Sequence, residues 1–377
     1  MVSTMVGPDT STGAEVQGAT GCLTIDLSAL GRNYTRLASI VAPARVAAVV
    51  KANAYGLGVE RVATILDRKG CRHFFVAHLS EALELRPMVS GDAQVFVLNG
   101  LQPGCEIACT EGGIIPVLNS MEQWRRWSTA ACSLNRILTA VLQFDTGMSR
   151  LGVPPDERPA LAQALRTDRN VEILFIMSHL ASADEPDSDQ NGEQLAEMRR
   201  IAAEFAGLDL SFANSGGVFL GDGYHGALAR PGIALYGGAP TAGVLSPMEP
   251  VVSLDVAVVQ VRTVPAGTKV GYGGVHVTQR DARLATIAAG YADGLPRSLS
   301  DRGAVYYEGV RLPIVGRVSM DSITVDVSAL PEGTLTLGSL VEVLGSNQTL
   351  EDLARDAGTI SYEILTGLGD RYQRRYR

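Results

Sequence analysis

Between residues 44 and 238, short apolar runs alternate with segments in which apolar side chains recur every three or four positions. The short runs predict buried strands, and the recurring pattern predicts amphipathic helices. We expect strands at Val46–Val50, His73–Ala77, Gln94–Leu98, Ile114–Val117, Thr139–Gln143, Val171–Met177, Leu210–Ala213 and Ile233–Tyr236. The clearest helical stripes each precede a glycine that can end a helix: Val59, Val62, Ala63 and Leu66 before Gly70, and Leu195, Met198, Ala202 and Phe205 before Gly207.

The alternation of strand and helix predicts an α/β fold, and eight such units favour a (β/α)8 barrel of the TIM type. An open doubly wound sheet would show the same alternation and stays an alternative. In a barrel, functional side chains gather beyond the carboxyl ends of the strands. The groups that follow a predicted strand here are Lys51, Arg150, His179, Ser215 and the Gly237-Gly238 turn.

The pattern changes after about Pro240, where short runs rich in Val and Ile are separated by Gly or Pro and predict a second, mostly β domain. Its expected strands are Ser253–Val261, Ala285–Ala289, Ala304–Tyr307, Ser322–Val327 and Leu340–Leu344. An early apolar segment at 22–28 is expected to pair with this domain. We therefore predict a flexible tail at 1–21, a barrel at 22–243 and a mostly β domain at 244–377.

Composition narrows the possible functions. The 377-residue chain is 46% hydrophobic, enough for two cores, and its net charge of −8 with no basic block argues against nucleic-acid binding. The five cysteines lack zinc or redox spacing and are read as reduced thiols. The first twenty residues lack the pattern of a secretory signal, and no stretch reaches the roughly 18 apolar residues of a membrane span. We expect a soluble, cytoplasmic protein.

Two motif-like segments and the histidines do not support a metal or nucleotide site. Residues 221–226 match the spacing of a dinucleotide-binding glycine loop but come late, with no long helix behind them. Residues 187–192 begin like a calcium loop, but Met198 stands where the bidentate Glu should be. No Cys, His or carboxylate cluster has metal-ligand spacing, so no metal is expected.

Lys51 is the most informative single position, because it ends the strongly apolar run Ala47–Val50. Such a lysine can be a surface amine whose stem packs on apolar neighbours. It can also be a desolvated amine whose lowered pKa suits it to Schiff-base chemistry. The residues around it, AAVVKANAYGLG at 47–58, resemble the cofactor-binding segment of alanine racemases.

Further blocks resemble the same family, and they occur in the family's order over both predicted domains. They are FDTGMSRLG at 144–152, SHLASAD at 178–184, NS at 214–215, ARPGIALYG at 229–237, VGYG at 270–273, GYADG at 290–294, GRVSMD at 316–321 and ISY at 360–362. The resemblance runs from about Leu23 to the C-terminus. It implies a pyridoxal-phosphate-dependent amino-acid racemase, acting on a small-molecule amino acid.

The resemblance assigns most of the cofactor site to the barrel. Lys51 would carry pyridoxal 5'-phosphate as the Schiff-base residue, with His179 beside it. The phosphate would be bound by three hydroxyls and two backbone amides: Tyr55, Ser215, Tyr362, Gly232 and Ile233. Arg230 would face the pyridine nitrogen. Because a guanidinium only donates hydrogen bonds, it would leave that nitrogen unprotonated and favour racemisation over transamination.

Racemisation needs a base on each face of a planar centre. By the resemblance Lys51 serves one face and Tyr272 the other, with Tyr272 donated by a partner subunit, which implies an obligate homodimer with shared sites. His179 and Arg230 would stabilise the Tyr272 phenolate. Substrate carboxylate would be bound by Arg150 and the Met320 amide. Side chains lining the substrate channel would be Asp184, Tyr291, Arg297 and Arg317.

One position departs from the family pattern. Many members have a carbamylated lysine two residues before the aspartate of the DTGM block, where it orients the substrate-binding arginine. Here that residue is Gln143, which brings no charge. We hypothesise that an anion such as chloride replaces the carbamate, or that Arg150 is held more loosely, which could admit serine or larger substrates.

The leading prediction is an alanine racemase that supplies D-alanine to peptidoglycan. A serine or broader-specificity racemase of the same family is the first alternative. A barrel-type pyridoxal-phosphate decarboxylase is less favoured, because the last cysteine is Cys132 and Arg230 stands where decarboxylases place a carboxylate. A non-enzymatic, cofactor-carrying barrel would lack the half of the chain that holds Tyr272.

Overall fold

The computed structural model describes residues 18–377 and divides the chain into two compact units. One unit is Ser28–Glu249, and the other joins the described residues up to Leu27 with Pro250–Arg377. The flexible tail expected at 1–21 falls mostly on residues 1–17, which lie outside the described part.

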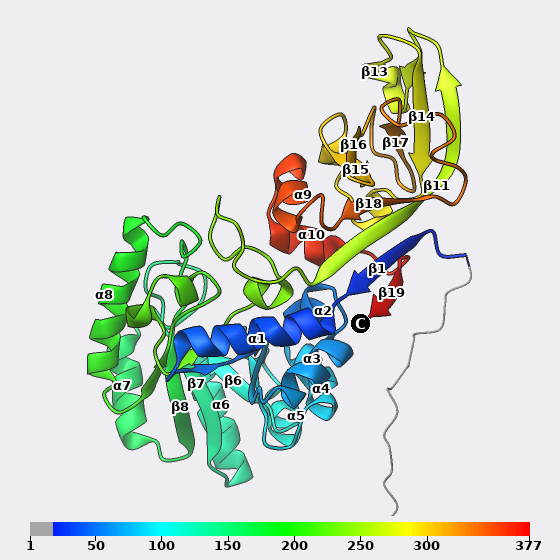
Figure 1. The fold of residues 1–377 in the computed structure, drawn as a ribbon. Helices are drawn as coiled ribbons and strands as arrows, with labels where there is room; N and C mark the ends of the chain where they lie inside the picture. The colour runs from blue at the N-terminus through cyan, green and yellow to red at the C-terminus, as the bar shows by residue number, and fades with distance from the viewer. Residues whose placement is uncertain (1–17) are drawn as a thin grey trace, which may run out of the picture. The chain divides into compact units, whose positions relative to one another are not determined.

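Parallel strands form the centre of the unit Ser28–Glu249 (Figure 1). Seven of them pair in chain order in one sheet: β3 (Ala48–Val49), β4 (His73–Val76), β5 (Gln94–Val97), β6 (Ile115–Leu118), β7 (Leu138–Gln143), β8 (Val171–Met177) and β9 (Asp209–Ser211). Beyond them, β10 (Leu228–Ala229) pairs in parallel with β2 (Arg45–Val46), which runs directly into β3. The Arg230 amide also donates to the Ala213 carbonyl oxygen, 2.8 Å away, just after β9. Hydrogen bonds thus continue from β9 through β10 to β2, and the predicted barrel-type α/β fold is confirmed.

Helices lie outside these strands (Figure 1). They are α1 (Leu27–Val41), α2 (Lys51–Tyr55), α3 (Val59–Arg68), α4 (Leu79–Leu85), α5 (Glu106–Glu111), α6 (Met121–Leu134), α7 (Arg158–Thr167) and α8 (Asp189–Glu204). The stripe predicted for α3 is confirmed, since Val59, Val62, Ala63 and Leu66 are its buried residues. The stripe predicted for α8 is confirmed in part: Met198 and Phe205 are buried and Leu195 and Ala202 half-buried, but the helix also buries Asn191, Gln194 and Ile201.

The strand predicted at Ile233–Tyr236 is wrong, because this segment is a buried 3₁₀ turn. The eighth strand is β10 instead, five residues earlier in the chain. Pro231 lacks an N–H group and cannot continue a strand ladder. The Ser215 hydroxyl oxygen then accepts the amides of Gly232 and Ala234 at 2.9 and 3.2 Å, which turns the chain. Apolar composition alone could not separate a buried turn from a buried strand.

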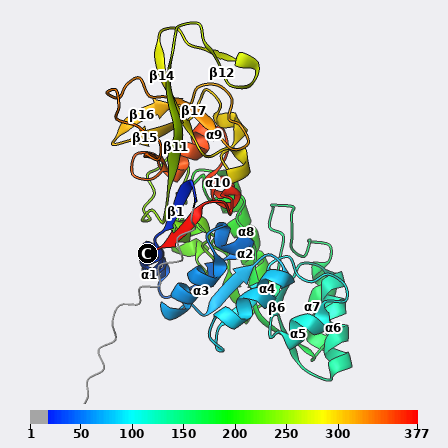
Figure 2. The same cartoon turned by 90° about the vertical axis from the view of Figure 1, so that its right-hand side faces the viewer.

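The second unit is built on an eight-stranded sheet in the order β16-β15-β18-β11-β1-β19, with β14 on β11 and β17 on β14 (Figure 2). Its strands are β1 (Gly21–Ile25), β11 (Val252–Val264), β14 (Ala282–Ile287), β15 (Ala304–Tyr307), β16 (Val310–Pro313), β17 (Ile323–Asp326), β18 (Leu340–Leu344) and β19 (Gln373–Tyr376). A hairpin of β12 (Lys269–Val270) and β13 (His276–Val277) and the helices α9 (Leu350–Ala357) and α10 (Ser361–Gly367) complete it. Strand β1 lies between β11 and β19, so the first and last strands of the described chain are neighbours.

Candidate active site

Lys51 follows β3 and begins a turn with a left-handed backbone. Residues 52–55 all have φ between 53° and 55°, a conformation that disfavours residues other than glycine by about 1–2 kcal/mol each. Local hydrogen bonds hold it: the Asn53 side-chain oxygen accepts the Val59 amide at 2.7 Å, and the Gly56 amide donates to Ala52 at 2.7 Å. The turn leaves Lys51 half-buried at the strand end and buries Tyr55.

The surroundings of Lys51 favour its neutral amine. Burial lowers the pKa of the Lys51 ammonium below its usual value, and the Arg150 cation lowers it further, while Glu81 opposes both. Glu81 is fixed nearby, since its carboxylate accepts the Ala52 amide at 2.6 Å. An amine that gives up its proton more readily than an ordinary lysine is a better nucleophile and base near neutral pH.

Arg150 lies on the loop that follows β7. The Asp145 carboxylate accepts the amides of Gly147, Met148 and Ser149 at 2.9 to 3.1 Å and folds this loop back on itself. Gly152 has a φ of 110°, and its Cα lies against the backbone of residues 144 and 145, where a side chain would collide. The loop therefore needs its Asp and Gly for shape, and Arg150 itself stays exposed.

Arg230 follows β10 and is buried, with 3% of its surface exposed. One terminal nitrogen contacts the Ser211 hydroxyl, and the other donates to the Ser178 carbonyl oxygen at 2.6 Å. Burial lowers the pKa of Arg230 to about 9, so the guanidinium stays protonated at pH 7. No carboxylate forms an ion pair with Arg230 among residues 18–377. This buried cation is held by neutral oxygens.

Sequence reasoning missed Ser211 as the support of Arg230. Its hydroxyl donates to the Leu228 carbonyl oxygen at 2.6 Å and so turns its oxygen toward the guanidinium. A signal was present, because a serine inside the otherwise apolar predicted strand Leu210–Ala213 must find a hydrogen-bond partner when it is fully buried. Glu81, which acts on Lys51, gave no comparable signal.

His179 follows β8 and lies near enough to Arg230, Arg150 and Lys51 to interact with each of them electrostatically. Burial, together with the nearby cations Arg230, Arg150 and Lys51, lowers the pKa of His179 to about 3. The imidazole is therefore neutral at pH 7. The structure thus brings together the predicted residues Lys51, Arg150, His179 and Arg230 at the carboxyl ends of four barrel strands, where Arg150 and Arg230 supply the positive charge.

Ser215, Gly232 and Tyr55 form a second part of the site, suited to an anion. The Ser215 oxygen already accepts the Gly232 and Ala234 amides, so its own hydrogen remains to donate outward. Gly232 has room for no side chain, because a Cβ atom there would collide with the Tyr55 hydroxyl. Tyr55 is fixed in turn by its contact with Tyr236, with ring centroids 4.6 Å apart. Donors around a position open only to glycine fit a phosphate group.

The remaining predicted residues, except Asp184 and Ile233, belong to the second unit, and Ile233 lies buried in the turn after Gly232. Tyr272 is 71% exposed on the turn that joins β12 and β13, and Met320 is 52% exposed. The Tyr291 amide donates to the Ser319 carbonyl oxygen at 3.1 Å, which sets the Tyr291 turn beside Met320. Arg297 and Arg317 are exposed in this unit, and Tyr362 is the second residue of α10. Asp184 is exposed on the barrel unit.

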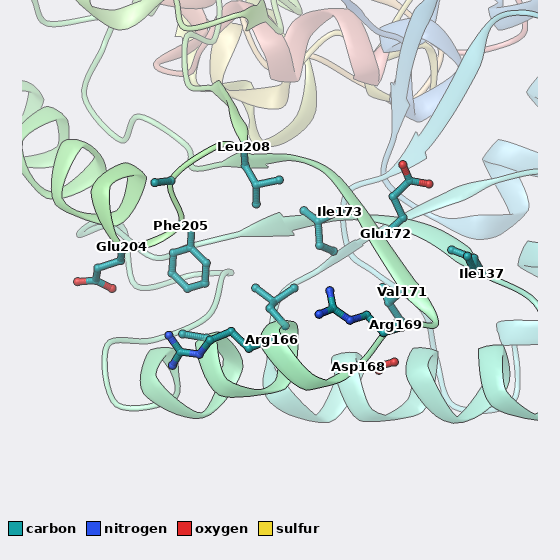
Figure 3. A pocket seen from close by; sticks show the side chains of 13 residues that line it. Ile137, Arg166, Asp168, Arg169, Val171, Glu172, Ile173, Glu204, Phe205 and Leu208 are labelled. Carbon is teal, nitrogen blue, oxygen red and sulfur yellow. The ribbon is translucent and has the colours of Figure 1, made fainter.

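A surface groove of about 610 Å³ lies elsewhere on the barrel unit (Figure 3). The amino end of β8 and the last turns of α7 and α8 line it, and Arg166, Glu172 and Phe205 are among its side chains. Lys51 and its neighbours follow the carboxyl ends of the strands, which is the end where barrel enzymes place their active sites. The groove is therefore separate from the candidate active site.

Neither a metal site nor a membrane segment accompanies this arrangement in the described part of the chain. Residues 18–377 contain no group of three or more His, Cys, Asp or Glu side chains that could hold a metal ion. Within the same residues, every helix is too short or too polar to span a bilayer.

Comparison with known proteins assigns the family. Residues 25–240 match the N-terminal domain of alanine racemase, and residues 251–376 match its C-terminal domain. A protein of Rhizobium johnstonii named "Alanine racemase, catabolic" is 75% identical over 98% of both chains. One of Agrobacterium fabrum with the same name is 61% identical over 95% of this chain and 92% of its own.

Solved structures of alanine racemases have the same fold as this chain. Alanine racemase from Bartonella henselae with covalently bound pyridoxal phosphate superimposes with a TM-score of 0.92 at 44% identity, over 95% of this chain and 100% of that one. The biosynthetic alanine racemase from Pseudomonas aeruginosa gives a TM-score of 0.87 at 34% identity, over 95% and 99%. The chain belongs to the alanine racemase family, a family of pyridoxal-phosphate-dependent isomerases.

Proposed function

We propose that this protein interconverts L- and D-alanine with bound pyridoxal phosphate, using Lys51 and Tyr272 as its two bases. The observation that carries the proposal is the half-buried Lys51 amine beside the Arg150 cation, together with a buried Arg230 that has no carboxylate partner in residues 18–377. A catalyst that binds a phosphate and a substrate carboxylate needs such positive charge. It also needs an amine that can exist unprotonated.

The residues present fit the cofactor. Lys51 would hold it through the amine, and Ser215, Tyr55 and the amides of Gly232 and Ile233 would bind its phosphate. Tyr362 would add a further hydroxyl from the second unit. When bound, pyridoxal phosphate supplies a conjugated ring that withdraws electrons from the α-carbon of an attached amino acid.

Arg230 selects the type of reaction. Its guanidinium can only donate hydrogen bonds, so an acceptor nitrogen opposite it stays unprotonated. This weakens electron withdrawal and favours quick return of a proton to the α-carbon over transamination. A decarboxylase is disfavoured by the same feature.

Lys51 and Tyr272 would move the proton on opposite faces of the α-carbon. A tyrosine is a weak base near neutral pH, where its usual pKa of about 10 keeps it protonated. Arg230 and the neutral His179 are the groups proposed to stabilise its phenolate. Each positioned base is expected to contribute roughly 10²–10⁴ in rate.

The two bases are proposed to come from different subunits of an obligate homodimer. Tyr272, Tyr291 and Met320 are all more than 40% exposed in the second unit. Exposed large side chains that gather on one unit are typical of a surface that a partner covers. Met320 would present its amide to the substrate carboxylate beside Arg150, while Asp184, Tyr291, Arg297 and Arg317 would restrict the substrate channel.

Gln143 marks where this protein departs from its relatives with a carbamylated lysine. Its side chain is buried at the end of β7 and forms no hydrogen bond within residues 18–377. We hypothesise that a small anion such as chloride bridges Gln143 and Arg150. Anomalous scattering from a bromide-soaked crystal would show a peak between them, and water alone at that position would contradict the hypothesis.

The direct test is incubation of the purified holoenzyme with L-alanine in D2O. Racemisation predicts loss of optical rotation together with deuterium at the α-carbon. Release of CO2 instead would identify a decarboxylase. Running L-serine in parallel tests the broader-specificity alternative, which faster turnover of serine than of alanine would support.

Two physiological roles remain to be separated. The first is supply of D-alanine to peptidoglycan. The second is alanine breakdown, which is favoured by the names of the relatives from Rhizobium johnstonii and Agrobacterium fabrum. Deleting the gene in its host distinguishes them, because a D-alanine requirement supports the first role and loss of growth on L-alanine as carbon source supports the second.

A further inference from the structure

The loop that carries Tyr272 has one internal backbone hydrogen bond, from the Gly274 amide to the Gly271 carbonyl oxygen at 3.1 Å. Gly271, Gly273 and Gly274 have φ values of 70°, 74° and 54°, and a glycine-rich backbone has many accessible conformations. The Tyr272 side chain is 71% exposed, so packing within its own unit does not fix the phenol either. Groups at the two ends of the loop must therefore determine where the phenol lies.

The first end of the loop rests on residues 315–317. Val270 packs with Val315 in a small buried cluster. A Cβ atom on Gly316 would come within 2.9 Å of the Val270 carbonyl oxygen, and one on Gly271 within 3.3 Å of the Arg317 amide nitrogen. The backbones of residues 270–271 and 316–317 thus approach so closely that a side chain on Gly271 or Gly316 would not fit well.

The other end of the loop is held by a carboxylate. His276 pairs with Val270 across the β12–β13 hairpin. Its Nδ1 donates to an Asp301 carboxylate oxygen at 2.9 Å, and the same oxygen accepts the Gly316 amide at 2.7 Å. A carboxylate accepts hydrogen bonds only, so Nδ1 carries the hydrogen. This Asp301 oxygen therefore connects His276, at the end of the loop, to Gly316, which contacts the beginning of the loop.

We infer that His276 and Asp301 are positioning residues that fix the Tyr272 loop for proton transfer. The inference rests on the proposed role of Tyr272. The turn that holds Asp301 is itself anchored, because the Ser300 hydroxyl oxygen accepts the Val318 amide at 3.0 Å. Asp301 has a φ of 53°, which Asp tolerates better than most residues.

Exposure of the pair makes its role separable from stability. The side chains of His276 and Asp301 are 31% and 40% exposed, and exposed polar pairs of this kind contribute little to folding. Breaking this pair should therefore leave the unfolding transition almost unchanged. Misplacing a catalytic group by a short distance, by contrast, can lower a rate strongly.

The test uses the holoenzyme with His276→Phe, which keeps a ring but removes the donor. We expect kcat to fall about tenfold, within the roughly 10²–10⁴ that a positioned base contributes, with little change in KM. The decisive readout is α-proton exchange in D2O, run from each enantiomer. If Tyr272 is misplaced, Lys51 can still remove a proton and return deuterium on its own face, so exchange without inversion should rise about tenfold relative to racemisation.

Two matched variants complete the design. His276→Asn keeps a side-chain N–H near the place of Nδ1 and should restore most of the racemisation. Arg355→Gln breaks a surface ion pair on α9 of the same unit and should behave as the wild type.

An unchanged exchange-to-racemisation ratio in His276→Phe would overturn the inference, whether or not its kcat falls. Failure of the proposed function would look different, because the wild-type protein itself would then not racemise alanine.

Discussion

At the scale of single residues, the chemistry of the site depends on how neighbouring charges act on the Lys51 amine. The Arg150 cation disfavours the charged ammonium and so lowers its pKa. Replacing Arg150 by Gln removes that charge, and the pKa of Lys51 should move up toward its ordinary value of 10.5. The pH dependence of Lys51 reductive methylation in the cofactor-free protein, followed by NMR, measures this. Arg125→Gln, an exposed arginine on α6, is the control and should leave the titration unchanged.

Gly232 offers a test of the proposed phosphate-binding site. In Gly232→Ala, the added methyl group would collide with the Tyr55 hydroxyl, and forced overpacking of this kind destabilises by about 1–3 kcal/mol. We expect weaker binding of pyridoxal phosphate and a lower urea midpoint of the cofactor-free protein. Adding Tyr55→Phe removes the colliding oxygen and should recover most of the stability. Equal losses in the single and double variants would mean that the collision is not the cause.

Sequence patterns identified the candidate site residues but not the side chains that hold them in place. Lys51, Arg150, His179 and Arg230 stood out because each follows a predicted strand or matches a family block. Ser211, which holds Arg230, lies far from Arg230 in the chain and became visible only through a side-chain hydrogen bond. Interactions between distant positions leave no periodic trace in a single sequence.

At the scale of elements, the left-handed turn at 52–55 is the most specialised backbone of the site. Asn53 stabilises this turn in two ways: Asn tolerates a left-handed backbone conformation, and its side-chain oxygen accepts a hydrogen bond from the Val59 amide. We expect Asn53→Ala to lower the free energy of unfolding by about 1–2 kcal/mol. Asn53→Gly also loses the hydrogen bond but keeps the backbone freedom, so it should lower it less. Urea unfolding of the two variants compares these effects, and a larger loss for glycine would contradict the assignment.

Elements with an uninterrupted apolar pattern were predictable, and several very short turns and strands were not. The stripe of α3 was recovered residue by residue, because its pattern is uninterrupted. The segment Ile233–Tyr236 was mistaken for a strand, because its turn is set by the distant Ser215 hydroxyl. The two-residue strands β12 and β13 were missed for another reason: too few residues are present to show a period.

At the scale of the whole molecule, the change of pattern near Pro240 indicated two domains because each builds its own core. The structure places the division at Glu249 and Pro250 and joins the described residues up to Leu27 to the second unit. How two chains would combine their sites lies beyond a single sequence, since no residue pattern within one chain encodes a partner's position.

The proposed sharing of sites between subunits makes a quantitative prediction for mixed dimers. Lys51→Ala and Tyr272→Phe homodimers should each be nearly inactive, because every site lacks one base. After unfolding and refolding an equal mixture, about half of the dimers contain one chain of each kind. If the bases come from different subunits, each such heterodimer has one site with both lesions and one intact site, so about a quarter of wild-type activity should return. If both bases belonged to one chain, neither site would be intact and no activity would return.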